Sequence, residues 1–235
     1  MKVIGITGGV GAGKSQALQY MQEKWGAYVC YADKIGHELQ QPGEPCYQRI
    51  VETFGAQTLE DTKQTDGKQI DLQQAEVKEN NIKQIDARKA DAKRDNTKKI
   101  DRKKLATIIF SQEKKRLALN AIMHPCIKER IRELIRIEAK RGTKYFLLEA
   151  ALLIEEAYEQ ICDELWYIYA PKEKRRQRLE QTRGYTQDKI EQIFASQLSD
   201  TKYREHCKVI IDNSEVVERM YEQIDALENS ENETM

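Results

Sequence analysis

Thr7-Gly8-Gly9-Val10-Gly11-Ala12-Gly13-Lys14-Ser15 is the stretch that decides the fold, and it follows the short apolar run 2–6. It satisfies the pattern G-x-x-x-x-G-K-[ST], in which the backbone N–H groups of a glycine-rich loop cradle phosphate oxygens. A predicted strand precedes the loop and a predicted helix follows it, so the positive end of the helix dipole also favours an anion. The segment from Gly8 to Gln16 therefore predicts a nucleotide-triphosphate site. Lys14 is expected to reach the β- and γ-phosphates, and the Ser15 hydroxyl is expected to bind Mg²⁺.

The rest of the chain alternates between strand and helix patterns. Further strands are predicted at 27–31, 145–148, 165–169 and 208–211. Helical patterns occur at 44–54, 101–110, 113–123, 125–140, 171–182, 186–198 and 215–227. This alternation predicts an α/β fold of the P-loop NTPase type, with three layers and a five-stranded parallel sheet. We expect one P-loop domain over 1–228 and a polar tail at 229–235. Within that domain, a helical acceptor region precedes the third strand, and a helical lid covers about 171–200.

Composition excludes several classes of protein. The 235 residues include 39 Lys and Arg against 39 Asp and Glu, and this zero net charge argues against a broad grip on nucleic acid or an acidic membrane. No apolar run approaches the roughly 20 residues that a membrane-spanning helix needs. The five cysteines form no C-x-x-C pair, which is typical of reduced thiols in the cytoplasm.

Residues 58–99 form a charged insertion that contains a repeat. The motif Lys-[Gln/Lys]-Ile-Asp recurs at Lys68, Lys83 and Lys98, and no aromatic residue lies in this segment. Its few apolar residues cannot build a core of their own. The segment is either a solvated surface excursion or an arm that binds a partner, and the sequence leaves both open.

The triphosphate site leaves more than one function possible. A GTPase would carry an [NT]-K-x-D motif, and none occurs in the chain. A small phosphoryl-transfer enzyme and a non-catalytic nucleotide switch both remain. Asp33 follows the second predicted strand, at the edge where ligands bind in open parallel sheets. It is expected either to orient an acceptor hydroxyl and take its proton or to cap a helix.

Several further motifs follow the glycine-rich loop along the chain. In order they are Tyr31-Ala32-Asp33, Gln41-Pro42-Gly43, Ile100-Asp101-Arg102-Lys103-Lys104-Leu105, His124-Pro125-x-Ile127, Ala151-Leu152-Leu153-Ile154-Glu155 and Ile211-Asp212-Asn213-Ser214. Together with the loop, they resemble the dephospho-coenzyme A kinase family, and the resemblance extends over the chain except about 58–99. Tyr31 stands where the family usually has a first aspartate, so only Asp33 inherits the carboxylate role.

This resemblance implies a function. The chain would use ATP and Mg²⁺ to phosphorylate the ribose 3′-hydroxyl of dephospho-coenzyme A, the last step of coenzyme A synthesis. A different small-metabolite or nucleoside monophosphate kinase, and a nucleotide-dependent regulatory protein, are the alternatives.

The resemblance also assigns roles to residues outside the loop. Asp33 would be the catalytic base, and Glu149 would contact Mg²⁺ through water. Arg183 would be the lid arginine that acts on the transferring phosphoryl group, while Arg178 would bind ATP. Arg102 and His124 would bind the acceptor, together with Asp33.

Overall fold

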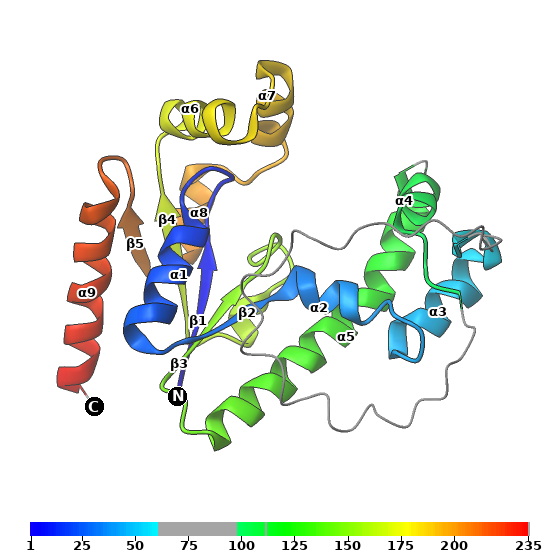
Figure 1. Ribbon diagram of the computed structural model, residues 1–235, viewed down its shortest axis with the longest axis horizontal. Helices are drawn as coiled ribbons and strands as arrows, with labels where there is room; N and C mark the ends of the chain where they lie inside the picture. Colours follow the sequence, from blue (N-terminus) through cyan, green and yellow to red (C-terminus); the bar gives the residue numbers. More distant parts are fainter. Residues whose placement is uncertain (61–97, 111, 235) are drawn as a thin grey trace, which may run out of the picture. The chain divides into compact units, whose positions relative to one another are not determined.

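Five strands form a single parallel sheet (Figure 1). The computed structural model describes residues 1–60, 98–110 and 112–234. The strands are β1 (Lys2–Thr7), β2 (Tyr28–Tyr31), β3 (Tyr145–Glu149), β4 (Glu164–Tyr169) and β5 (Val209–Asp212). Their order is β2-β3-β1-β4-β5, and every neighbouring pair is parallel. The predicted five-stranded parallel sheet is confirmed, with β1 and its phosphate loop in the centre.

The helices agree with the sequence patterns except at three places. They are α1 (Lys14–Trp25), α2 (Ala32–Glu38), α3 (Pro45–Phe54), α4 (Arg102–Phe110), α5 (Glu113–Lys140), α6 (Lys172–Arg183), α7 (Gln187–Ala195), α8 (Asp200–His206) and α9 (Val217–Thr234), with short 3₁₀ turns η1 (Ala56–Thr58) and η3 (Tyr158–Gln160). The short helix α8 was not predicted, and α9 extends into the segment expected to be a polar tail. None of the helices in the described ranges has the length and apolar character of a membrane span.

The third difference is a helix break that the structure does not have. Because proline lacks an N–H group and disrupts a helix interior, Pro125 predicted the start of a new helix. The structure instead has one helix, α5, of 28 residues with Pro125 inside it. Met123 and Ile131, on either side of the proline, are buried. Burial of these side chains offsets the hydrogen bond that the proline removes.

The chain forms two compact units. One comprises Met1–Leu39 and Met123–Met235, and the other comprises Gln40–Ile122. The first contains the whole sheet and the helices of the predicted lid. The second contains α3 and α4, which belong to the predicted acceptor region.

The two ends of the predicted insertion are paired within the second unit. Leu59 and Ile100 form an antiparallel bridge, Glu60 N donates to Lys99 O at 2.9 Å and Asp101 N donates to Thr58 O at 2.8 Å. The described residues on either side of the insertion therefore lie next to each other, and closing a chain between neighbouring ends costs only slowly more entropy as its length grows. The repeats themselves lie outside the described residues.

The main core lies between the sheet and the helices α1 and α9. Alternate residues of the central strands, such as Ile4 and Ile6, face this core, and both side chains are fully buried. Met21 of α1 and Met220 of α9 are fully buried in the same cluster. Figure 1 shows both helices on one side of the sheet. This packing fixes α1, and therefore the start of that helix at the phosphate loop.

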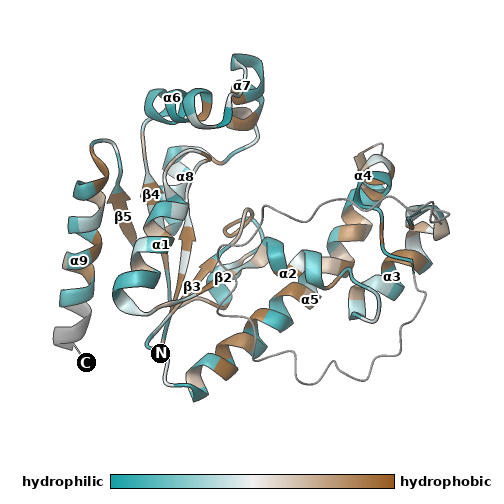
Figure 2. Cartoon of the chain, in the orientation of Figure 1, coloured by the Kyte–Doolittle hydropathy of each residue, from teal (hydrophilic) through white to brown (hydrophobic). Residues whose placement is uncertain are grey.

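The predicted lid has a separate, smaller core. Figure 2 shows α6 as hydrophilic over most of its length, and Leu179 is its one buried residue. Leu179 packs with Ile190 and Phe194 of α7, and Val10 of the phosphate loop packs against this cluster. The lid helices are therefore held against the loop by a few apolar contacts.

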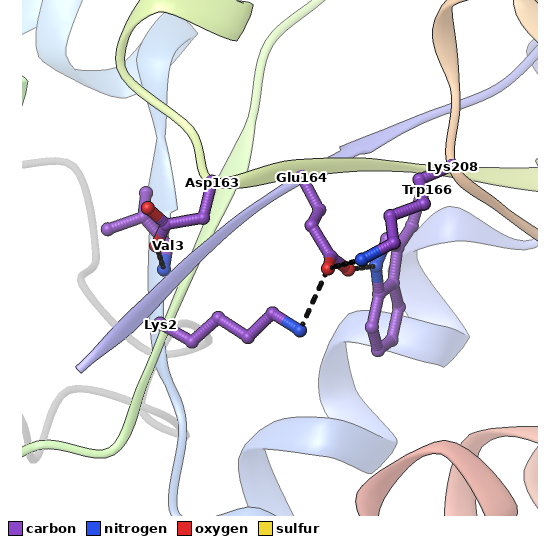
Figure 3. Close-up of polar contacts among 6 residues, drawn as sticks. All are labelled: Lys2, Val3, Asp163, Glu164, Trp166 and Lys208. Carbon is purple, nitrogen blue, oxygen red and sulfur yellow. Dashed lines mark hydrogen bonds and ion pairs between the residues drawn. The ribbon is translucent and has the colours of Figure 1, made fainter. Parts of the chain in front are cut away.

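A carboxylate with little exposure, Glu164, links the amino ends of β1, β4 and β5 (Figure 3). Glu164 at the start of β4 accepts a hydrogen bond from Trp166 Nε1 at 2.9 Å, and Lys2 and Lys208 form ion pairs with it. Its side chain is only 9% exposed. Burial by itself would raise the pKa of Glu164, but hydrogen bonds from Lys208, Trp166 and Lys2 outweigh it and lower the pKa to about 2. The charged form therefore stabilises this edge.

We predict that Glu164→Gln lowers the free energy of unfolding by about 1 to 2 kcal/mol at pH 7, because charge-assisted hydrogen bonds are lost. The pKa of Glu164 is lowered on folding, so its contribution is complete above its ordinary value of 4.5 and is lost as the pH falls towards 2. Urea unfolding of wild type and variant measures the difference between their free energies of unfolding, and this difference should become smaller between pH 5 and 3. The exposed Glu222 pairs with Arg219 on α9, so Glu222→Gln is the control and should cost little. A difference in unfolding free energy that is the same at all pH values would contradict a stabilising role for the charged form of Glu164.

Candidate active site

The glycine-rich loop connects β1 to α1 in the conformation that a phosphate cradle requires. Gly13 has a φ of 102°, which side chains rarely adopt, and a Cβ atom there would clash with the side-chain amide of Asn213. Ala12 N donates to Gly9 O at 3.1 Å, which closes a turn within the loop. The first turn of α1 contains no acidic residue. No acidic side chain in this turn therefore competes with an anion for the positive end of the helix dipole.

Lys14 lies at the centre of a group of charges. Its Nζ donates to Gly8 O at 2.6 Å, so the side chain folds back along the loop. Burial lowers the pKa of Lys14, Glu149 opposes this shift, and Arg175 and Arg183 reinforce it. Asp33 also raises the pKa of this lysine. Residues of α2, β3 and α6 thus act electrostatically on the predicted phosphate-binding lysine.

Two carboxylates belong to this group because of strand register. Glu149, the last residue of β3, is paired with Ile6 of β1 and with Tyr31 of β2. Asp33 follows Tyr31 by two residues and is exposed. Burial raises the pKa of Glu149, Lys14 opposes that shift, and Asp33 reinforces it. The sheet therefore brings both predicted carboxylates to the edge that carries the phosphate loop.

Asp33 does not cap a helix. The N-cap of α2 is Tyr31, and Asp33 lies inside the first turn. The interpretation of Asp33 as a helix cap, which the sequence left open, is wrong. Its carboxylate is exposed and does not serve as the cap of α2.

Arg178 and Asn213 hold the loop by donating hydrogen bonds to its backbone carbonyl groups. Arg178 Nη1 donates to Gly11 O at 3.3 Å, and its Nη2 donates to Asn213 O at 2.9 Å. The buried Asn213 amide donates to Ala12 O at 2.7 Å. Both side chains therefore occupy loop carbonyls and leave the loop N–H groups available. Asn213 belongs to the motif Ile211-Asp212-Asn213-Ser214, but the sequence did not predict it as a site residue.

The predicted lid arginine and an unpredicted one lie at different places on α6. Arg183 is the last residue of the helix and is exposed, with its guanidinium 6.0 Å from the Tyr185 ring centroid. Arg175 is closer to the loop, since a Cβ atom on Gly9 would clash with its guanidinium. The signal that could have identified it is its spacing, because Arg175 and Arg178 are three residues apart on one helix face.

The two remaining predicted residues have other surroundings. Arg102 is the first residue of α4 in the second unit and is exposed. His124 lies in α5, where its Nδ1 is 2.5 Å from Glu156 Oε2 in the geometry of an ion pair but not of a hydrogen bond. Lys128, one turn further along, donates to Glu156 O. His124 therefore holds the segment after β3 in this structure, and its contact with an acceptor stays a prediction.

The oxygen donors at the site suit a nucleotide-bound Mg²⁺ better than a metal held by protein alone. Within the described ranges, His, Cys, Asp and Glu nowhere gather in a group of three or more that could hold a metal. Mg²⁺ commonly takes one or two protein oxygens and completes its shell with phosphate and water. The hydroxyl of Ser15 in α1 and the carboxylate of Glu149 match that donor set. The glycine-rich loop and Lys14 match the phosphates of ATP.

We predict that Asn213→Ala lowers the free energy of unfolding by about 1 to 3 kcal/mol, because Ala12 O loses a buried donor. The loop should also bind ATP less tightly, since its backbone is no longer held in place. Thermal melting and calorimetric titration with ATP measure the two effects. Asn229→Ala, at an exposed position of α9, is the matched control and should change neither. Wild-type ATP affinity in Asn213→Ala would show that the loop does not need the hydrogen bond from Asn213 to Ala12 O in order to bind ATP.

Comparisons with known proteins identify the family of this chain. The family model described as dephospho-CoA kinase matches residues 2–67 and 60–218. The dephospho-CoA kinase of Shouchella clausii is 31% identical over 231 residues, covering 98% of this chain and 99% of the relative. That of Carboxydothermus hydrogenoformans is 30% identical over 224 residues, covering 95% and 91%. The solved structure of dephospho-CoA kinase from Campylobacter jejuni has the same fold, with a TM-score of 0.64, 22% identity and coverage of 100% of both chains. The chain belongs to the dephospho-CoA kinase family.

Proposed function

We propose that this protein transfers the γ-phosphoryl group of ATP to the ribose 3′-hydroxyl of dephospho-coenzyme A, forming coenzyme A and ADP. The observation that carries the proposal is the meeting of a phosphate loop and two carboxylates at one edge of the sheet, in a chain of this family. The five free cysteines support a reducing compartment, and we place the reaction in the cytoplasm.

The loop and Lys14 would bind the nucleotide. The backbone N–H groups of residues 8–16 would hold the phosphates, and Lys14 would turn from Gly8 O towards the β- and γ-phosphates. Mg²⁺, bound with the nucleotide and held by Ser15 and through water by Glu149, would neutralise charge on the phosphate oxygens. Arg178 supports this step indirectly, since it holds the carbonyls of the loop.

Asp33 would act on the acceptor. Its exposed carboxylate lies within electrostatic range of Lys14, close to the expected position of the γ-phosphate. There it would orient the 3′-hydroxyl and accept its proton during transfer. Arg183, which lowers the pKa of Lys14, would stabilise negative charge on the transferring group. Arg102 and His124 are proposed to contact the acceptor.

The experiment that tests this function measures ADP release with ATP and Mg²⁺ and three sets of acceptors. These are dephospho-coenzyme A, a panel of nucleoside monophosphates, and no acceptor. We expect turnover with dephospho-coenzyme A alone. Turnover with a monophosphate would assign a nucleoside monophosphate kinase, and ADP release without acceptor, or none at all, would favour a nucleotide-dependent regulatory protein.

We predict that Asp33→Asn lowers kcat by about 100- to 10,000-fold, which is the range for loss of a general base. Its dissociation constant for ATP should stay within about twofold of wild type, since Asp33 does not touch the loop. Steady-state kinetics and calorimetric titration measure these quantities. Asp188→Asn is the matched control, because Asp188 also lies in the first turn of a short helix. Near-wild-type turnover in Asp33→Asn would remove the base assignment.

A further inference from the structure

Arg175 of α6 lies directly on the phosphate loop. A Cβ atom on Gly9 would clash with Arg175 Nη1 and would stand 3.1 Å from Gln197 Oε1. The backbone carbonyl oxygen of Arg175 would be 3.0 Å from a Cβ atom on Gly11. Only a residue without a side chain allows the guanidinium to approach the loop this closely at Gly9. The contact is therefore a built feature of the loop and the helix together.

Neutral groups hold this guanidinium in place. Arg175 Nη1 donates to Gln197 Oε1 at 3.0 Å, and the guanidinium carbon is 4.6 Å from the ring centroid of Phe194. Its Nε is buried and has no hydrogen-bond partner among the described residues. Nor does any carboxylate in the described part of the chain form an ion pair with Arg175. The positive charge is thus oriented but not neutralised.

The neighbouring arginines of the same helix are used differently. Arg176 pairs with Glu191 of α7, and Arg178 donates to backbone carbonyls of the loop and of Asn213. Among these three, Arg175 is the arginine that contacts the loop and has neither an anionic nor a backbone-carbonyl partner in the described residues. This difference separates a residue that serves the fold from one that is available to a ligand.

The position of Arg175 is unfavourable without an anion. It lowers the pKa of Lys14, after the larger effect of burial, because the two cations lie near each other. Two cations at one loop repel, and the repulsion is relieved when a polyanion binds between them. A guanidinium is also well matched to phosphate, because it can donate two parallel hydrogen bonds.

We propose that Arg175 contacts the transferring γ-phosphoryl group, with Gln197 and Phe194 as positioning residues. The assignment rests on the proposed function for the identity of the reaction. In a loop of this type the lysine reaches the β- and γ-phosphates, so Lys14 would mark the place of the transferring group. The Arg175 guanidinium lies against Gly9 of the same loop and close enough to Lys14 to act on its charge. Arg175, Gln197 and Phe194 also border a pocket of about 400 Å³, so these side chains are not closed off by packing on that side.

The test compares ATP with ADP, because their difference isolates the γ-phosphate. Calorimetric titration with each nucleotide and Mg²⁺ would be carried out on wild type, Arg175→Met, Arg175→Lys and the control Arg176→Met. We expect Arg175→Met to lose ATP affinity by about tenfold or more, the size of a charge-assisted hydrogen bond, while ADP affinity changes less than about twofold. Its kcat should fall by about 100-fold, as on loss of one oxyanion-type donor. Arg175→Lys should recover part of both losses, and Arg176→Met should match wild type.

Two results would overturn the proposal. One is an equal loss of affinity for ATP and ADP, which would mean that Arg175 only shapes the loop. The other is unchanged ATP affinity and kcat in a variant whose melting temperature matches wild type. If Arg175→Met does not fold, Arg175→Lys and Gln197→Leu carry the same comparison.

The positioning role has its own test. Gln197→Leu should lower kcat, and the double variant with Arg175→Met should be no worse than Arg175→Met alone, since Gln197 acts through the arginine. Additive losses would show an independent role. Nucleotide binding needs no acceptor, so the titrations remain informative even if dephospho-coenzyme A proves not to be the substrate.

Discussion

The hydrogen bond from the buried Asn213 amide to Ala12 O, together with the Arg178 contacts, holds the loop on which the rest of the site depends. A phosphate cradle needs its N–H groups turned inward, so its carbonyl groups must find partners elsewhere. Here those partners come from the end of β5 and from α6. The loop, the last strand and the lid helix therefore form one unit of hydrogen bonds, and the nucleotide site depends on all three.

Charge is distributed unequally between the two edges of the sheet. At the edge where β4 starts, Glu164 is surrounded by Lys2, Lys208 and Trp166, and the charges are matched. At the carboxyl ends of the strands, burial lowers the pKa of Lys14, Glu149 and Asp33 oppose that shift, and Arg175 and Arg183 add to it. The matched charges around Glu164 stabilise the fold. The cations around Lys14 favour the binding of an anion such as a triphosphate.

Much of the fold could be predicted because its signals are local. Apolar runs of four or five residues located all five strands, and the glycine-rich motif located the start of α1. The misassignments have physical reasons. Pro125 is a local signal for a break, but burial of Met123 and Ile131 within one long helix overrides it. Helix α8 is short and polar, and Tyr203 is its one buried side chain. Its sequence therefore has no helical repeat of apolar residues by which it could be predicted. The repeats of the insertion lie outside the described residues, so their role stays open.

The sequence by itself determined the α/β class, the phosphate loop, the strand ends that carry Asp33 and Glu149, and the resemblance to the kinase family. These follow from residue types at short spacings. Only the tertiary structure decided that Asp33 is free of a capping role, that Arg178 holds the loop, and that Arg175 rests on Gly9 without an anionic partner in the described chain. The last two facts depend on contacts between residues more than 150 positions apart. No short-range pattern encodes them, because each is set by how the sheet and the lid helices pack around the loop.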